Sequence, residues 1–269
     1  MSVYLMDHHL HTEFSGDSFE KPENVIAAAK KCGLNSICFT DHLDFDYVAE
    51  GVLYELDKDD YFNSMSKYKE QTTNELAIYL GVETGLEPDK AFRLDDFINR
   101  HPYDFIIGSS HLVNGKDPYY PEYFQGKSKT EALMEYFESI ANNLKFCKNF
   151  DVYGHIDYCI RYSPEKEDYY DYMEFYDILK DILKTLIDNG KGIEVNTSGY
   201  RSGLPQPNPN FDIIKMYREL GGEIITVGSD AHKATDVGYR IKETTECLAD
   251  CGFKYITVFK NRKPEFIKL

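Results

Sequence analysis

The feature that most constrains the fold of this 269-residue chain is a regular alternation of short apolar runs with longer segments of helical period. Short apolar runs are typical of buried strands, and the amphipathic segments between them are typical of helices that cover a sheet. The alternation predicts a parallel β-sheet with helical crossovers. The strand-like runs are VYLMDHH (3–9), SICFTDH (36–42), AIYLGVE (77–83), DFIIGSSH (104–111), DVYGHID (151–157), GIEVNTS (192–198), EIITVGSDAH (223–232) and KYITVF (254–259).

The segments between these runs are predicted to be helices. Pro22 suits the first turn of the first helix, and Gly33 suits its C-terminal cap. No Pro-, Gly- or Ser-rich linker interrupts the pattern, and α/β barrels of this length are routine single domains, so we expect one domain spanning residues 1–269. The helical segments are residues 21–34, 59–76, 94–100, 129–148, 171–189, 211–220 and 240–250.

Each of the first seven strand-like runs ends in residues that can bind a metal or take part in catalysis. In a β/α barrel the C-terminal ends of all strands lie on one face, so these side chains would converge. Only His8 and His101, of the eight histidines, fall outside this set. The residues at the strand ends are His9 and His11, Asp41 and His42, Glu83, His111, His155 and Asp157, Asn196 and Ser198, and Asp230 and His232.

A single histidine at a strand end is more often a hydrogen-bonded structural residue than a ligand. So many ionisable groups in one place must be paired or coordinated, because isolated burial of charge is costly. In the H-L-H motif, the two-residue period of a strand puts His9 and His11 on one side and His8 on the other. Asp230 and His232 repeat this spacing. The pattern predicts a metal centre, and its nitrogen and oxygen ligands suit Zn²⁺, Mn²⁺ or Fe²⁺.

Composition narrows the range of functions. The net charge of −16 leaves no basic footprint for nucleic acid, whereas a small phosphorylated ligand can be bound by a few local cations or metals. No apolar stretch is long enough to span a membrane, and the N-terminus lacks the pattern of a secretory signal. The six cysteines include no C-x-x-C pair. We therefore expect a reduced, cytoplasmic protein.

Taken in order, the motifs resemble those of the polymerase and histidinol phosphatase (PHP) superfamily. The resemblance covers the whole chain and implies a distorted (β/α)7 TIM-like barrel with a trinuclear metal centre. Because the sequence contains eight strand-like runs, either the last run lies outside the barrel or the strand count is wrong. The matching motifs are HLH (9–11), TDH (40–42), GVE (81–83), SSH (109–111), GHID (154–157) and SDAH (229–232).

The resemblance also implies how three divalent ions are held. Many relatives have a histidine in the first loop, where this sequence offers only Asp17, so the third site should be richer in oxygen ligands. Asp17 could instead be an ordinary loop residue. The implied ligands are His9, His11, Glu83 and Asp230 for the first ion, Glu83, His111 and His155 for the second, and His42, His232 and Asp17 for the third.

Within the superfamily, the chain is most similar to the histidinol-phosphate phosphatases, notably at YGHIDYCIRY (153–162) and NTSGYRSG (196–203). The implied reaction is hydrolysis of L-histidinol phosphate to L-histidinol and phosphate, a step of histidine biosynthesis. Metal ions activate water and neutralise phosphoryl charge, and a nucleophile between the ions that Glu83 bridges fits this chemistry. Asp230, His232 or water would protonate the leaving group, and the sequence leaves this choice open.

Four residues are candidates for binding the substrate. Arg161 and Arg201 each follow a strand end that carries site residues, and a guanidinium matches phosphate with paired donors. Either arginine could equally be a surface residue. Lys116 is a weaker candidate, and Ser198 would donate to the phosphate or cap a turn. Tyrosine-rich loops such as DPYYPEYF (117–124) offer rings on which an imidazole could stack.

Two other functions stay open. A phosphodiesterase or nuclease of the same superfamily would have to bind nucleic acid, which the acidic composition disfavours. A non-catalytic metal-binding PHP module would be expected to have lost ligands, whereas every motif position of this chain carries a competent one. The sequence leaves the native metal and the oligomeric state open.

Overall fold

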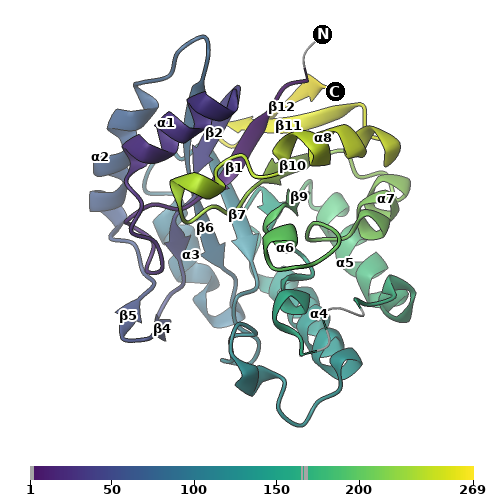
Figure 1. Ribbon diagram of the computed structural model, residues 1–269. Helices are drawn as coiled ribbons and strands as arrows, with labels where there is room; N and C mark the ends of the chain where they lie inside the picture. Colours follow the sequence, from purple (N-terminus) through teal and green to yellow (C-terminus); the bar gives the residue numbers. More distant parts are fainter. Residues whose placement is uncertain (1–2, 165, 167–168) are drawn as a thin grey trace.

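The centre of the protein is a sheet of parallel strands, which a computed structural model describes for residues 3–164, 166 and 169–269 (Figure 1). Along the sheet the strands follow the order β1-β2-β6-β7-β8-β9-β10, which is also their order in the chain. The short β3 follows β2 along the chain and also pairs with β6. The bounds are β1 (Met6–Leu10), β2 (Ser36–Phe39), β3 (His42–Leu43), β6 (Ala77–Gly85), β7 (Phe105–Ser109), β8 (Val152–Tyr153), β9 (Gly192–Asn196) and β10 (Ile225–Gly228).

Backbone hydrogen bonds at the C-terminal ends of the first and last strands, and just beyond them, nearly close this sheet into a barrel. The His11 N–H donates to the Ala231 carbonyl at 3.0 Å, and the Asp230 N–H donates to the His9 carbonyl at 2.9 Å. Gly228 permits this contact, because a Cβ atom at that position would lie 2.4 Å from the Cβ of His9. The predicted distorted (β/α)7 barrel is confirmed, and its closure brings the H-x-H and D-x-H motifs together.

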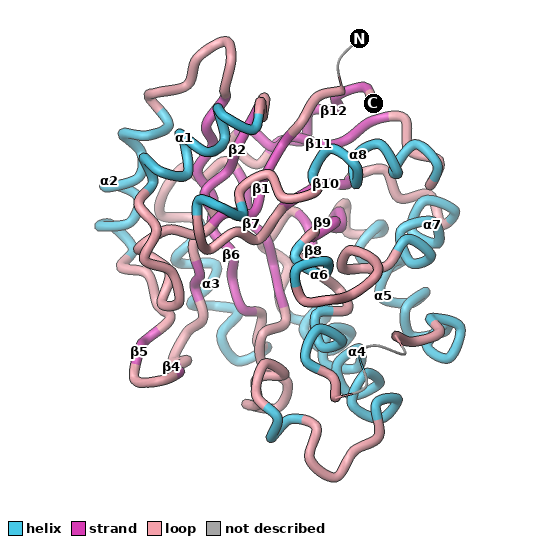
Figure 2. Tube along the Cα trace, in the orientation of Figure 1, coloured by secondary structure: helices cyan, strands magenta, loops and turns pink. Residues whose placement is uncertain are grey.

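Helices connect the strands and cover the outside of the barrel (Figure 2). The helix predicted for residues 59–76 ends at Lys69, because the Thr72 and Thr73 hydroxyls bond to nearby backbone groups and turn the chain toward β6. The helices are α1 (Pro22–Cys32), α2 (Lys58–Lys69), α3 (Ala91–Ile98), α4 (Lys129–Phe146), α5 (Tyr176–Asp188), α6 (Ser198–Arg201), α7 (Phe211–Glu219) and α8 (Ile241–Asp250). Short 3₁₀ turns are η1 (Pro88–Lys90), η2 (Pro121–Tyr123), η3 (Tyr158–Tyr162), η5 (Tyr172–Phe175) and η6 (Ala234–Asp236).

The eighth strand-like run lies outside the barrel. It forms β11 (Tyr255–Lys260), which pairs antiparallel with β12 (Lys263–Lys268) in a sheet of its own. This hairpin packs against the N-terminal ends of the barrel strands, where the rings of Phe259 and Phe105 stack with centroids 5.1 Å apart. The first of the two alternatives for this run is therefore correct. Across the described part of the chain, no helix combines the length and the apolar character needed to cross a membrane.

The opposite, C-terminal end of the barrel is surrounded by loops. The loop after β3 contains a small hairpin of β4 (Val48–Ala49) and β5 (Val52–Leu53), visible at the lower left of Figure 1. Its turn places Glu50 and Gly51 at φ values of 53° and 81°. The backbone bond from the Asp44 N–H to the Tyr54 carbonyl, 2.7 Å long, ties this loop to the strand end. The hairpin thus stands beside the mouth of the barrel.

Candidate metal centre

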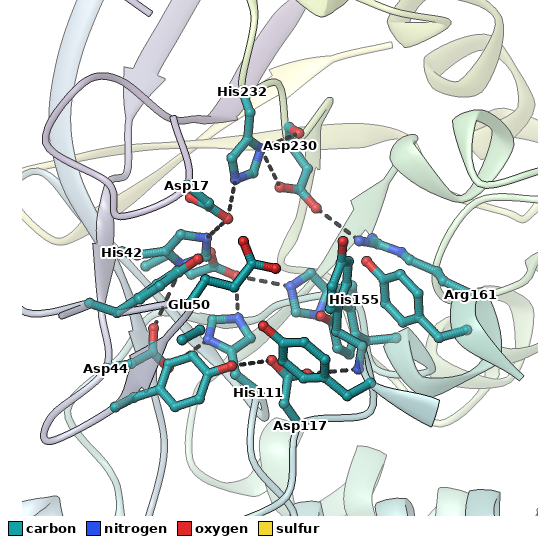
Figure 3. Close-up of a pocket in the computed structure, with 18 residues that line it drawn as sticks. Asp17, His42, Asp44, Glu50, His111, Asp117, His155, Arg161, Asp230 and His232 are labelled. Carbon is teal, nitrogen blue, oxygen red and sulfur yellow. Dashed lines mark hydrogen bonds and ion pairs between the residues drawn. The ribbon is translucent and has the colours of Figure 1, made fainter. Parts of the chain in front are cut away.

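The side chains at the C-terminal strand ends converge as the sequence predicts, and Figure 3 shows several of them around one cleft. Glu83 lies at the centre of the group and is fully buried. His42 and His232 are partly exposed, and Asp17 lies in the exposed first loop. The other members of the group are buried: His9, His11, His111, His155 and Asp230.

The Glu83 carboxylate separates two sets of histidine nitrogens. Its Oε2 atom lies 3.1 Å from His9 Nε2 and 3.0 Å from His42 Nδ1. Its Oε1 atom lies 2.9 Å from His155 Nε2 and 3.2 Å from His111 Nε2. Burial alone would raise the pKa of Glu83, but the neighbouring His9, His111 and His42 hold it well below its usual value. An ionised carboxylate in this position can bridge two cations.

Asp230 lies beside His9 and a further histidine, His11. Its Oδ1 atom lies 3.4 Å from His11 Nε2 and 3.7 Å from His9 Nε2. Burial and the nearby His232 and His42 lower the pKa of His11 well below its usual value, so this ring is neutral. A neutral imidazole is the form that binds metals.

Asp17 lies beside the two partly exposed histidines. Its Oδ2 atom is 3.1 Å from His232 Nε2 and 3.6 Å from His42 Nε2. Partial burial opposes ionisation of Asp17, but His42 and His232 hold its pKa well below its usual value. The structure therefore brings Asp17 to the place where the sequence predicted a third set of ligands.

Several buried polar atoms of this group have no hydrogen-bond partner among the described residues, although buried polar atoms normally have one. They face one another at the distances given above and meet the requirements of metal ligands. Three ligand sets have their atoms within 4.8 Å of one another: His9, His11 and Glu83; His42, Glu83 and His111; and His11, His42 and His232. The unpartnered atoms are His9 Nε2, His11 Nε2, His42 Nδ1, Glu83 Oε2 and His232 Nε2. The residues present thus fit a multinuclear metal centre.

Outer groups orient the histidines, and two of them were not predicted. The Glu194 Oε1 atom lies 2.5 Å from His9 Nδ1, and the Asp44 Oδ1 atom lies 2.7 Å from His111 Nδ1. Such bonds fix which ring nitrogen faces the metal and raise its basicity. Glu194 is the one acidic residue in the apolar strand GIEVN, and a charged residue inside a buried strand is the feature of the sequence that could have identified it. Asp44 follows the T-D-H motif by two residues, which is a much weaker signal.

His8 points away from the cluster, as the strand period predicts. Its Nε2 atom lies 2.9 Å from the Ser36 hydroxyl, and its ring meets that of Tyr79 edge-on with centroids 5.6 Å apart. Burial lowers the pKa of His8 to about 3. His8 is therefore a neutral residue of the barrel wall.

Arg161 is the one lysine or arginine that lines the cleft within the described chain. Arg161 is only 4% exposed. Its guanidinium donates from Nη1 to Asp230 Oδ2 at 3.0 Å and from Nε to Asn208 Oδ1 at 2.7 Å. Its Nη2 atom has no partner among the described residues. The cleft has a free volume of about 240 Å³. A buried donor that faces such a cleft is placed to bind an anion.

The other three predicted substrate ligands do not line the cleft. Arg201 is held by the backbone, since its Nη1 and Nη2 atoms donate to the Ser229 and Asp230 carbonyls at 2.7 and 2.8 Å, and its role in binding the substrate stays a prediction. It clamps a turn in which Asp230 has a φ of 55°, an uncommon conformation for a residue other than glycine. Ser198 donates to Asp230 Oδ2 at 3.2 Å, and Lys116 is exposed in a turn outside the cleft.

The fold and the site together define a metal-binding β/α barrel, with its centre at the C-terminal strand ends and the buried Arg161 beside it. The family model of the PHP domain matches residues 7–198. The chain therefore belongs to the PHP domain family.

Similarity to known proteins extends over nearly the whole chain. The histidinol-phosphatase of Lactococcus lactis subsp. lactis (strain IL1403) is 30% identical over 260 residues, which cover 96% of this chain and 95% of the relative. A probable histidinol-phosphatase of Clostridium acetobutylicum is 32% identical over 252 residues, covering 93% and 95%. The crystal structure of the Lactococcus histidinol phosphate phosphatase, complexed with zinc, L-histidinol and phosphate, matches with a TM-score of 0.89 at 29% identity, over 98% of this chain and 100% of that one.

Proposed function

We propose that this chain is a metal-dependent phosphatase that hydrolyses L-histidinol phosphate to L-histidinol and phosphate. The observation that carries the proposal is the Glu83 carboxylate between two sets of histidine nitrogens, in the same cleft as the unpartnered Nη2 atom of Arg161. Such a site combines metal ligands with an anion donor, which is what hydrolysis of a phosphate monoester requires. The named substrate is supported by the similarity to the Lactococcus enzyme.

The distances support three divalent ions, with zinc, manganese or iron as candidates. Each proposed set includes a carboxylate oxygen that lies within 3.7 Å of the Nε2 atom of every histidine of that set. Carboxylate and imidazole ligands suit all three metals. The proposed sets are His9, His11, Glu83 and Asp230; Glu83, His111 and His155; and His42, His232 and Asp17.

When bound, such ions would supply an activated water and offset the charge of the phosphoryl group. The contribution of the chain itself is to hold the ester and to move protons. Arg161 donates from Nη2 to a phosphoryl oxygen while Asp230 and Asn208 hold the rest of its guanidinium in place. Asp230 and His232 line the cleft and can exchange a proton with the attacking water or the leaving-group oxygen.

The cleft suits a small metabolite better than a polymer. It has a volume of about 240 Å³, and among the described residues a single arginine lines it, which offers no extended basic groove for a nucleic acid backbone. We therefore also propose that nucleic acid is not a substrate. A cytoplasmic location is part of the proposal, because a charged phosphorylated intermediate does not cross membranes unaided.

The test is phosphate release from a panel of metabolic monoesters after reconstitution with zinc, manganese or iron, with elemental analysis of each preparation. The proposal expects kcat/KM for L-histidinol phosphate to exceed that for every other ester of the panel. A single-stranded DNA oligonucleotide serves as the competing substrate. Cleavage of the DNA without release of phosphate from L-histidinol phosphate would overturn the proposal in favour of a nuclease.

A further inference from the structure

The mouth of the cleft differs chemically from its floor. The floor carries the proposed metal ligands and Arg161, whereas the mouth carries the carboxylates of Glu50 and Asp117 among tyrosine rings (Figure 3). Glu50 comes from the turn of the β4–β5 hairpin, and Asp117 comes from the loop after β7. Two loops that are distant in sequence therefore place acidic groups at one opening.

The two carboxylates are held differently. Asp117 is fixed, because its Oδ2 atom accepts a bond of 2.6 Å from the Tyr47 hydroxyl and its Oδ1 atom accepts one of 2.8 Å from the Tyr119 N–H. The Glu50 carboxylate accepts no hydrogen bond from any described residue, and its side chain projects over the cleft in Figure 3. Glu50 is thus an acceptor that is free to meet a ligand.

Aromatic rings border the same opening. The rings of Tyr158 and Tyr162 meet with centroids 5.2 Å apart, and Tyr162 meets Tyr119 at 5.1 Å. The faces of such rings attract cations. No lysine or arginine other than Arg161 lines the described cleft, so neither carboxylate at the mouth is paired with an ammonium or guanidinium group of the cleft. Divalent ions bound below would make the floor positive and leave the mouth negative.

A cleft with this polarity selects a ligand that is anionic at one end and cationic at the other. The anionic end of such a ligand would meet the buried Arg161, whose unpartnered donor faces the cleft. We propose that Glu50, together with Asp117, forms a subsite for a protonated amine or imidazole, so that the protein selects cationic phosphate monoesters. The inference rests on the proposed function, because it uses the phosphate position at the floor to orient the ester.

The experiment compares selectivity between a cationic and a neutral ester. The measured quantity is kcat/KM for L-histidinol phosphate divided by kcat/KM for phenyl phosphate, which keeps an aromatic ring but lacks a cation. In Glu50→Gln this ratio falls roughly tenfold, the scale of one lost charge-assisted hydrogen bond, and in Glu50→Lys it falls further. Glu122→Gln removes an exposed carboxylate that does not line the cleft, and it leaves the ratio at the wild-type value.

An unchanged ratio in Glu50→Gln, whether both esters lose activity equally or neither does, would overturn the inference and show that the mouth only stacks aromatic groups. Ethanolamine phosphate against ethyl phosphate separates this failure from failure of the proposed function. If L-histidinol phosphate is not turned over but Glu50→Gln lowers the selectivity for ethanolamine phosphate, the subsite stands and the named substrate falls. Calorimetry adds a test that does not depend on turnover. We expect Glu50→Gln to weaken binding of L-histidinol more than binding of inorganic phosphate. Equal weakening of both would contradict the subsite.

Discussion

The floor and the rim of the cleft are built in different ways. Most side chains of the floor lie at the ends of barrel strands. Hydrogen bonds from outer carboxylates hold two of its histidines in place, from Glu194 for His9 and from Asp44 for His111. The rim consists of loop residues such as Glu50 and Tyr47, carried by a short hairpin. Strands fix side chains relative to one another, whereas loops vary between relatives without disturbing the barrel.

This difference suggests a division of labour. Changes at the floor should remove metal and abolish turnover of every ester, since all chemistry depends on the same cluster. Changes at the rim should alter which ester is preferred and leave the metal content unchanged. Variants at the two places therefore test the comparison, and the expected effects decrease from the centre of the floor outward.

The largest effect is expected for Glu83→Gln. The neutral amide cannot bridge two cations, so we expect metal per chain to fall and kcat to drop roughly a thousandfold, the upper end of the effect of losing one electrostatic group in an active site. Elemental analysis and kcat are measured on the same preparation, with Glu122→Gln as the control. Full metal occupancy with near-normal kcat would rule out the bridging role.

The three neighbouring histidines should differ sharply. His9→Asn and His11→Asn each remove one imidazole from the proposed first site, so both should lose metal and most activity. His8→Asn should keep its metal and most of its kcat, with a cost in thermal stability because the ring is buried against Ser36 and Tyr79. Metal content and Tm of all three variants check this. Loss of metal in His8→Asn with retention in His9→Asn would reverse the assignment.

The two arginines compare a residue that lines the cleft with one that supports the turn of Asp230. Arg161→Met should lower kcat/KM by roughly ten- to a hundredfold at constant metal content, since it removes a charge-assisted bond to the phosphate worth ~1.5–3 kcal/mol. Arg201→Met releases the two carbonyls that it clamps, so we expect weaker metal binding and lower stability rather than a specific rise in KM. Metal titration and steady-state kinetics distinguish the two patterns. An Arg201→Met protein with full metal affinity and a selectively raised KM would return this residue to the phosphate site.

A milder effect is expected one layer behind the ligands. Glu194→Gln weakens the bond that orients His9, and changes of this kind typically reduce metal affinity or activity by roughly ten- to a hundredfold. The readout is the metal dissociation constant obtained by competition with a chelator. Glu219→Gln, on the outer helix α7, provides a control outside the cleft. An unchanged constant would show that His9 needs no carboxylate behind it.

The smallest effect is expected at the rim. Tyr47→Phe removes one bond to Asp117, which keeps its bond from the Tyr119 N–H. We expect kcat/KM for L-histidinol phosphate to fall about threefold with no change in metal content, because the lost bond positions Asp117 and does not itself contact the substrate. A loss of metal in this variant would show that rim and floor are not independent.

The same division explains what the sequence could predict. The convergence of the histidines, Glu83 and Asp230 follows from two local rules, the two-residue period of a strand and the common direction of parallel strands. The position of His8 follows from the same period. The alternation of strands and helices predicted a parallel sheet, and the resemblance of the motifs added that the sheet forms a seven-stranded barrel.

Other features depend on contacts that no local pattern carries. Glu194 and Asp44 act across neighbouring strands and loops, so their partners were visible only in the folded chain. Arg201 follows a strand end as Arg161 follows another, but the short helix α6 turns it toward the backbone of the Ser229–Asp230 turn. The acidic mouth depends on how two loops approach each other, which the composition of either loop does not specify.

Anomalous diffraction from crystals of the zinc-reconstituted protein tests the central claim most directly. The account predicts a metal peak on each side of the Glu83 carboxylate, one near His9, His11 and Asp230 and one near His111 and His155, with a third peak beside Asp17. It would be contradicted by a fully loaded protein in which Glu83 contacts one metal or none.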